Sequence, residues 1–143
     1  MHIRVDRDAF VEALGPVQSV VEVKKALPIL SHVLLEAGPD HVSLFGTDLD
    51  VGLRRQVSGE VIEPGAITLS AKKLYEVVKE LPQATIEFHV DADLQVAISC
   101  QRSNFRMKGL PKDEFPSLPD LHGGGELLIE AKVFRDMLRK TLF

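Results

Sequence analysis

Histidine, cysteine and aspartate are the residues here whose side chains could do chemistry, and their spacing predicts no catalytic or metal site. No two of the five histidines have the spacing by which one helix presents two metal ligands. Cys100 ends an apolar run without a marked histidine partner, which favours a buried, inert thiol over a nucleophile. The histidines are His2, His32, His41, His89 and His122. We therefore expect no catalytic residue, no metal and no cofactor.

Two short motifs could in principle hold an ion or a phosphate group. Residues 46–50 (GTDLD) carry two carboxylates, but an Asx-type turn between two strands explains both of them. Residues 123–125 (GGG) lack the lysine and the serine or threonine of a phosphate-binding loop. We therefore interpret the first motif as a turn and the second as part of a linker.

Basic residues form a more informative pattern, because they cluster in three places. Lys24 and Lys25 are adjacent, and lysines recur at positions 72, 73 and 79. Four basic residues lie between positions 102 and 112, a stretch that contains no acidic residue. Two interpretations remain open: a solvated charged surface, or a surface that faces phosphate groups. The second would bind nucleic acid independently of sequence and with strong salt dependence.

The composition limits the possible partners. The 143 residues carry a net charge of -4 and are 45% hydrophobic, which excludes a generally basic nucleic-acid-binding protein but not a local basic patch. A single cysteine excludes an internal disulfide bond. No apolar run reaches 18 residues, and the N-terminus has no apolar stretch of signal-peptide length. We expect a soluble cytoplasmic protein that makes no membrane contact.

A repeated pattern at residues 3–14, 67–78 and 127–138 organises the chain. In each copy the first two apolar anchors alternate as in a strand, and the next two are four residues apart as on a helix. Asp6 and Ser70 are suitable helix N-caps, and Glu130 is a poorer one. Each copy thus predicts a short strand that leads into an amphipathic helix. The anchors are Ile3, Val5, Phe10 and Leu14, then Ile67, Leu69, Leu74 and Val78, then Leu127, Ile129, Phe134 and Leu138.

Strand-like runs bounded by turn residues follow the first two copies. Two complete β-α-β-β-β units are therefore predicted, at about residues 1–63 and 64–108. Gly15 and Pro16 interrupt the first helical pattern, which predicts either a kink or a second short helix beginning at Pro16. The runs are residues 29–36, 41–46 and 51–57 in the first unit, and 85–90, 94–99 and 104–108 in the second.

Residues 109–125 differ from the rest of the chain. They contain three prolines and end in three glycines, a composition typical of an extended linker. The third copy then supplies one strand and one helix, which cannot close a core of their own. We expect the chain to be the front part of a longer protein. Residues 1–120 would be a first domain, and residues 121–143 the end of a linker and the start of a truncated second domain.

Several different short motifs are spread along the whole chain in a specific order and spacing. They are residues 27–30 (LPIL), 46–49 (GTDL), 63–65 (EPG), 70–73 (SAKK), 81–82 (LP), 102–105 (RSNF), 110–111 (LP) and 114–118 (EFPSL). Each motif is weak alone, but together they resemble the bacterial sliding clamp, the beta subunit of DNA polymerase III. The resemblance implies an α+β DNA-clamp fold, in which two β-α-β-β-β repeats place their helices on one face of antiparallel sheets. Three such domains would form a chain that closes head to tail as a dimeric ring.

The resemblance also assigns roles to individual residues. It implies that Lys24, Lys72, Lys25 and Arg7 face DNA. It implies that a head-to-tail dimer surface contains Lys73, Val77, Leu81, Arg102, Phe105 and Met107. Ordinary core packing is the alternative for Val77, Leu81 and Met107. Asn104 stands where the family pattern has a basic residue.

The function implied by the resemblance is that of a DNA replication processivity factor without catalytic activity. Such a clamp encircles duplex DNA, pairs with a second copy of itself and tethers the replicative polymerase. Contacts with the catalytic subunit and the clamp loader would involve regions mostly absent from this chain. The alternative is a free-standing protein-interaction module on a clamp-like fold that does not encircle DNA. A small-substrate enzyme would require a buried pocket with a perturbed acid, base or metal.

Overall fold

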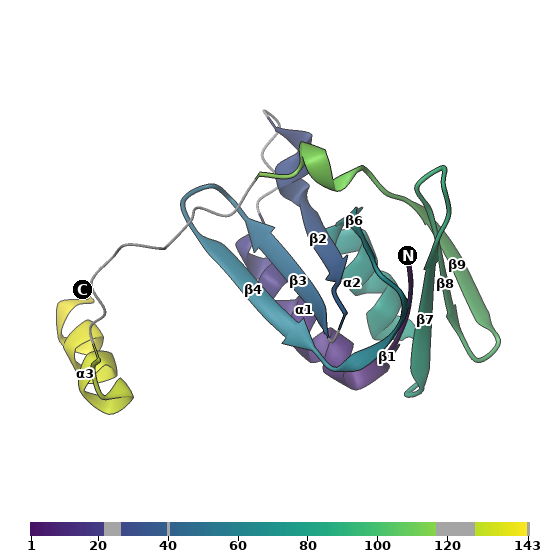
Figure 1. Ribbon diagram of the computed structural model, residues 1–143. Coiled ribbons are helices and arrows are strands. Elements are labelled where there is room, and N and C mark those ends of the chain that lie inside the picture. The colour runs from purple at the N-terminus through teal and green to yellow at the C-terminus, as the bar shows by residue number, and fades with distance from the viewer. Residues whose placement is uncertain (22–26, 40, 117–127, 143) are drawn as a thin grey trace.

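The structure, a computed structural model, describes residues 1–21, 27–39, 41–116 and 128–142 (Figure 1). The strands are β1 (His2–Asp6), β2 (His32–Ala37), β3 (Val42–Thr47), β4 (Gly52–Val57), β5 (Gly59–Glu63), β6 (Gly65–Ser70), β7 (Thr85–Val90), β8 (Gln95–Cys100) and β9 (Ser103–Lys108). The α-helices are α1 (Arg7–Val20), α2 (Ala71–Glu80) and α3 (Ala131–Thr141). Two short 3-10 helices are η1 (Pro28–Ser31) and η2 (Lys112–Glu114).

The strands form two antiparallel sheets, and the two repeated units exchange their first strands. Sheet A has the order β5-β1-β7-β8-β9, and sheet B has the order β4-β3-β2-β6. Strand β1 of the first unit pairs with β7 of the second, with Ile3 opposite Phe88. Strand β6 of the second unit pairs with β2 of the first, with Ile67 opposite Leu35. The predicted α+β fold is confirmed, and because of the exchange each sheet contains strands of both units.

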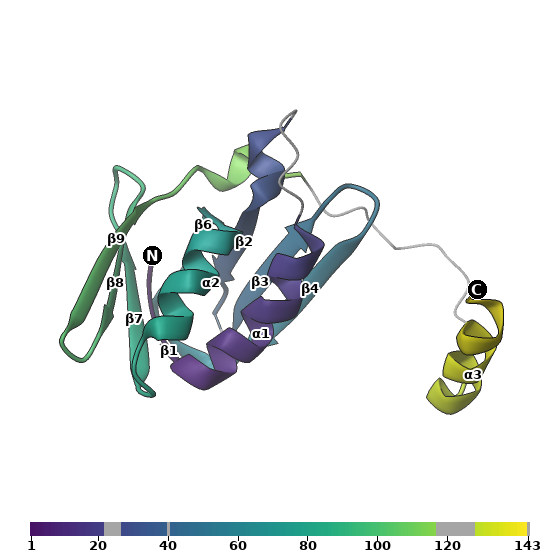
Figure 2. The ribbon, with the colours of Figure 1, turned by 180° about the vertical axis from the view of Figure 1, so that it is seen from behind.

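Helices α1 and α2 lie side by side and cover the same face of sheet B (Figure 2). Helix α1 packs on β3 and β4, and α2 packs on β2 and β6. The amide of Ala9 donates to Asp6 Oδ1 at 3.0 Å, which is the predicted N-cap of α1. Helix α1 continues through Pro16, so the alternative of two short helices is wrong. Buried Leu14 and Val17 flank Pro16 on the core side, and their packing offsets the hydrogen bond that proline cannot make.

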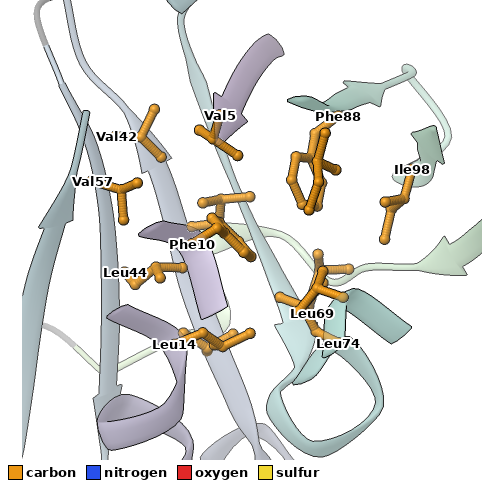
Figure 3. Close-up of a cluster of buried hydrophobic side chains, with 14 of the residues drawn as sticks. Val5, Phe10, Leu14, Val42, Leu44, Val57, Leu69, Leu74, Phe88 and Ile98 are labelled. Carbon is orange, nitrogen blue, oxygen red and sulfur yellow. The ribbon is translucent and has the colours of Figure 1, made fainter. Parts of the chain in front are cut away.

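The core lies between the helices and the sheets. All eight apolar anchors of the first two repeat copies are buried there, and the rings of Phe10 and Phe88 pack with centroids 5.1 Å apart (Figure 3). The third copy differs, because Ile129, Phe134 and Leu138 are between 41% and 48% exposed. Helix α3 forms as predicted, but described residues 128–130 form no strand. A strand needs a paired neighbour to be stable, and residues 128–130 have no such neighbour among the described residues.

The predicted strands differ from the observed ones in several details. Strand β5 was not predicted, although it pairs with β1 and occupies an edge of sheet A. Its close approach requires glycine, since a Cβ at Gly59 would lie 2.7 Å from the carbonyl oxygen of Arg4. The run 29–36 becomes a strand only from His32, because Pro28 begins a 3-10 helix. The run 94–99 starts one residue later, since Leu94 has φ 60° and belongs to the preceding turn.

The segment 109–116, predicted as linker, packs against the domain. The main chains of Thr68 and Leu110 form an isolated β-bridge at the edge of sheet B. Phe115 is buried, and its ring meets the ring of Phe45 at 5.6 Å in an edge-to-face arrangement. The described part of this segment therefore belongs to the first domain, and the remainder of the expected linker lies outside the described residues.

Candidate functional site

A groove of about 400 Å³ lies between helix α2 and strand β9. It brings together four of the six residues predicted for the dimer surface, and three charged residues complete its lining. The predicted four are Lys73, Val77, Phe105 and Met107, and the additional three are Glu76, Glu80 and Arg106. The groove therefore has an apolar floor with charged groups along its sides.

Strand alternation places the aromatic part of the groove. Phe105 stands opposite Ile98 and Met107 opposite Val96, and both partners on β8 are fully buried. Phe105 and Met107 therefore project on the core side of sheet A. Because β9 is the last strand of this sheet, Phe105 extends past the covered core and is 40% exposed. Phe105 is thus an exposed aromatic side chain at the open edge of a sheet, and it lies in one groove with the apolar side chains of Val77 and Met107.

Helical spacing places the other wall of the groove. Lys73, Val77 and Glu80 are separated by four and three residues, so they share one face of α2. Leu74 and Val78 lie on a different face and are buried in the core. The same spacing could have identified Glu80 from the sequence, because it follows directly from the predicted positions of Lys73 and Val77.

Two predicted dimer-surface residues lie outside the groove. Leu81 is 4% exposed and belongs to the hydrophobic core, so its side chain is already covered within this chain. Arg102 is exposed in the tight turn between β8 and β9, beside Gln101, whose φ is 51°. The groove and the turn nevertheless lie on the same edge strand of sheet A.

The structure describes two of the four residues predicted to face DNA, Lys72 and Arg7. Lys24 and Lys25 lie outside the described residues. The side chain of Lys72 is 74% exposed on α2, and its Nζ is 3.9 Å from Glu76 Oε1, a solvent-exposed pair of the kind that contributes little to stability. Arg7, at the start of α1, instead directs its guanidinium group toward main-chain carbonyls at the end of α2.

Helices α1 and α2 form a surface of balanced charge. Together they carry four basic and four acidic side chains. A hollow of about 370 Å³ on this surface is lined by Lys72 and Lys79 and also by Glu76 and Glu80. Gln18 and Tyr75 complete its lining, and their proximity could not be predicted because it depends on how α1 and α2 pack against each other. Such a surface would attract phosphate groups weakly, because each lysine has a carboxylate nearby.

A charged cluster on sheet A joins three strands. Glu87 Oε1 on β7 lies 2.6 Å from His2 Nε2 and 3.1 Å from Arg4 Nη2 on β1. Arg4 also reaches Glu60 Oε2 on β5 at 3.4 Å. The hydrogen bond to His2, together with the nearby charge of Arg4, holds the pKa of Glu87 below its ordinary value. The cluster therefore links β1 to both of its neighbouring strands, β5 and β7.

The candidate chemical groups have structural roles where the structure describes them. Cys100 is buried and its thiol donates to the carbonyl oxygen of Pro82 at 3.6 Å. Asp48 Oδ1 accepts from the amides of Asp50 and Val51, which is the predicted Asx-type turn. Among the described residues, no group of three or more His, Cys, Asp and Glu side chains could hold a metal ion. Within the same residues, no helix is long and apolar enough to cross a membrane.

Comparison with known proteins identifies the family. The family profile described as "DNA polymerase III beta subunit, N-terminal domain" matches residues 1–119. The beta sliding clamp of Pseudomonas putida is 37% identical over 145 residues, which cover 100% of this chain and 39% of that protein. The beta sliding clamp of Halalkalibacterium halodurans is 33% identical over 151 residues, with 100% and 40% covered. The crystal structure of the DNA polymerase III subunit beta from Pseudomonas aeruginosa is 35% identical, with a TM-score of 0.90 over 97% of this chain and 38% of that chain.

The fold and these matches together define the class: the chain belongs to the family of bacterial DNA polymerase III beta subunits, the sliding clamps. The predicted resemblance is thereby confirmed. That family consists of non-catalytic processivity factors in DNA replication. The chain spans about two fifths of the length of the curated relatives it matches.

Proposed function

We propose that this chain is the N-terminal part of a ring-shaped replication clamp that encircles duplex DNA and tethers the replicative polymerase. Family membership supports this proposal, as does the fact that the matched relatives are more than twice as long as the chain. Residues 1–120 would form the first domain of the ring, and residues 121–143 would begin the second. The protein would act in the cytoplasm and catalyse no reaction of its own.

The surface formed by α1 and α2 is the proposed DNA-facing side. Lys72 projects from it into solvent, and Lys24 and Lys25 follow α1 in the sequence. Lysine contacts to phosphate groups position a duplex without reading its bases. Because the helices carry as many acidic as basic groups, such contacts would be weak and would allow the duplex to slide. Retention on DNA would then come from closure of the ring and not from affinity.

Self-association at the groove is the proposed route to ring closure. Strand β9 is an edge strand of sheet A, and an edge strand can pair with a strand of another chain. Phe105 lies beside that edge and would anchor the contact in an apolar pocket of the second copy. Lys73 and Arg102 would add charged contacts at its margin. The exposed position of Phe105 next to an open strand edge is the observation that carries this part of the proposal.

The polymerase and the clamp loader are the remaining proposed partners. We assign their contacts mostly to regions absent from this chain, because the chain spans only about two fifths of the length of the curated relatives it matches. A protein that served only as an interaction module would not need to close a ring, so self-association and DNA retention separate the two functions.

Substitution of Phe105 tests the proposed self-association. In the protein encoded by the complete reading frame, Phe105→Ala should weaken the dimer by about 2 kcal/mol, roughly thirtyfold, as for an aromatic anchor residue. Ile62→Ala is a matched control, since Ile62 is 45% exposed on β5 at the opposite edge of sheet A. Sedimentation equilibrium measures the dimer dissociation constants of both variants. An unchanged dimer constant for Phe105→Ala would remove Phe105 from the interface.

A further inference from the structure

Arg7 connects the beginning of α1 with the end of α2. Its Nε donates to the carbonyl oxygen of Val78 at 3.2 Å, and its Nη2 donates to the carbonyl oxygen of Lys79. Its Nη1 lies 2.6 Å from Asp8 Oδ1 in the first turn of α1. The amide of Arg7 also donates to the carbonyl oxygen of Ala84, after α2 has ended. The Arg7 side chain is only 17% exposed, so most of its surface is covered within this chain.

These contacts meet a specific need of helix α2. The last carbonyl groups of a helix have no partner within the helix, and they form the negative end of its dipole. The guanidinium group supplies two donors in a planar fork to the carbonyls of Val78 and Lys79, and its positive charge suits their position. The Val78 carbonyl also accepts from the amide of Leu81 at 3.4 Å, so Arg7 adds a second donor to it. A lysine side chain at position 7 would preserve the charge but could not reproduce the fork.

The end of α2 that Arg7 holds is also one wall of the groove. Val77 and Glu80 line the groove from this last turn, and Lys79 and Glu80 line the hollow on the helical surface. Movement of the turn would therefore alter the surface beside Phe105 although Arg7 itself does not line the groove.

We infer that Arg7 is a positioning residue that fixes the C-terminal turn of α2 and thereby shapes the groove, and that it is not a contact to DNA. This inference rests on the proposed self-association for its functional part. Its structural part stands on the hydrogen bonds to Val78 and Lys79 alone.

Hydrogen exchange tests the structural part in the 143-residue chain. In Arg7→Lys, the amides of residues 78–81 should exchange about ten- to a hundredfold faster, as expected for the loss of a charge-assisted hydrogen bond. The amides of β8 should keep their wild-type rates. Arg4→Lys is the matched control, because Arg4 bonds the side-chain carboxylates of Glu60 and Glu87 on sheet A, which a lysine can also approach. Wild-type exchange at residues 78–81 in Arg7→Lys, or an equal acceleration in β8, would overturn the inference.

Binding measurements test the functional part in the protein encoded by the complete reading frame. Arg7→Lys should weaken the dimer by several fold, less than Phe105→Ala does. Arg7→Gln should leave the salt dependence of DNA binding unchanged, whereas loss of a phosphate contact would reduce its slope by about one. A reduced slope in Arg7→Gln with a wild-type slope in Arg7→Lys would overturn the inference and assign Arg7 to DNA. If the wild-type protein did not dimerise, the proposed self-association would fail, and the exchange rates would still decide the role of Arg7.

Discussion

Thr68 binds the carbonyl oxygen of Leu110 with two donors, its amide and its hydroxyl group, each at 3.0 Å. Leu110 returns the contact, because its amide donates to the carbonyl oxygen of Thr68 at 3.1 Å. Thr68 is fully buried at the edge of sheet B, and Leu110 lies two residues beyond the last strand of sheet A. The contact thus ties the segment 109–116 to β6, the first strand of the second unit.

Replacing Thr68 by valine should lower the free energy of unfolding by about 1 kcal/mol, because one buried hydrogen bond is lost while the side-chain shape is kept. Urea denaturation followed by circular dichroism measures the change. Thr85→Val is the control, since Thr85 is exposed on β7. Equal stability of Thr68→Val and the wild type would show that the hydroxyl bond contributes nothing.

Two glycines that face helices should respond in opposite directions to alanine. A Cβ at Gly46 would lie 2.8 Å from Val17 Cγ1 and from Val21 Cγ2, so Gly46→Ala should force α1 away from β3 and cost about 1–3 kcal/mol. A Cβ at Gly15 would meet only Tyr75, at 3.6 Å, so Gly15→Ala should stabilise α1 by about 0.5–1 kcal/mol. Thermal unfolding of both variants tests the pair. A stabilising Gly46→Ala would contradict the described packing of α1.

The pH dependence of stability should reflect Glu87. Because its folded-state pKa is lowered, its carboxylate contributes stability that is complete above the ordinary value of 4.5 and is lost as the pH falls through the folded-state pKa. Glu87→Gln should therefore narrow the difference in unfolding free energy between neutral and acidic solution. Glu12→Gln, at an exposed position on α1, is the control. If the unfolding free energy of Glu87→Gln falls as steeply toward acidic pH as that of the wild type, the cluster with His2 and Arg4 does not form.

The repeated anchors predicted much of this fold because apolar periodicity reports burial directly. Phe10 and Leu74 are buried at the positions that helical spacing predicted. Strand β5 was not predicted because its position depends on pairing with β1. Only Val61 of its side chains packs against the core, so its sequence shows no apolar alternation. Exchange of strands between the two units was not predicted either, since it depends on pairing between residues 79 to 87 positions apart for β1 and β7, and 28 to 38 positions apart for β6 and β2.

The candidate site was predictable in part. Alternation along β9 could place Phe105 and Met107 on one face, and the resemblance supplied their role. The environment of Arg7 could not be predicted, because main-chain carbonyls at the end of a distant helix leave no mark in the sequence. Leu81 could not be assigned from the sequence for a different reason. Its apolar side chain suits both an interface and a core, and only the tertiary structure shows that it is buried.

Retention on circular DNA tests the central proposal most directly. The protein encoded by the complete reading frame, once loaded, should remain on a nicked circular duplex at a salt concentration that abolishes its equilibrium binding, because a closed ring cannot leave sideways. Cutting the circle once should release it, since the ring can then slide off the ends. Gel filtration of the labelled protein with the DNA measures both states. Equal retention on circular and linear DNA, or loss from both, would contradict the proposal that the protein encircles DNA.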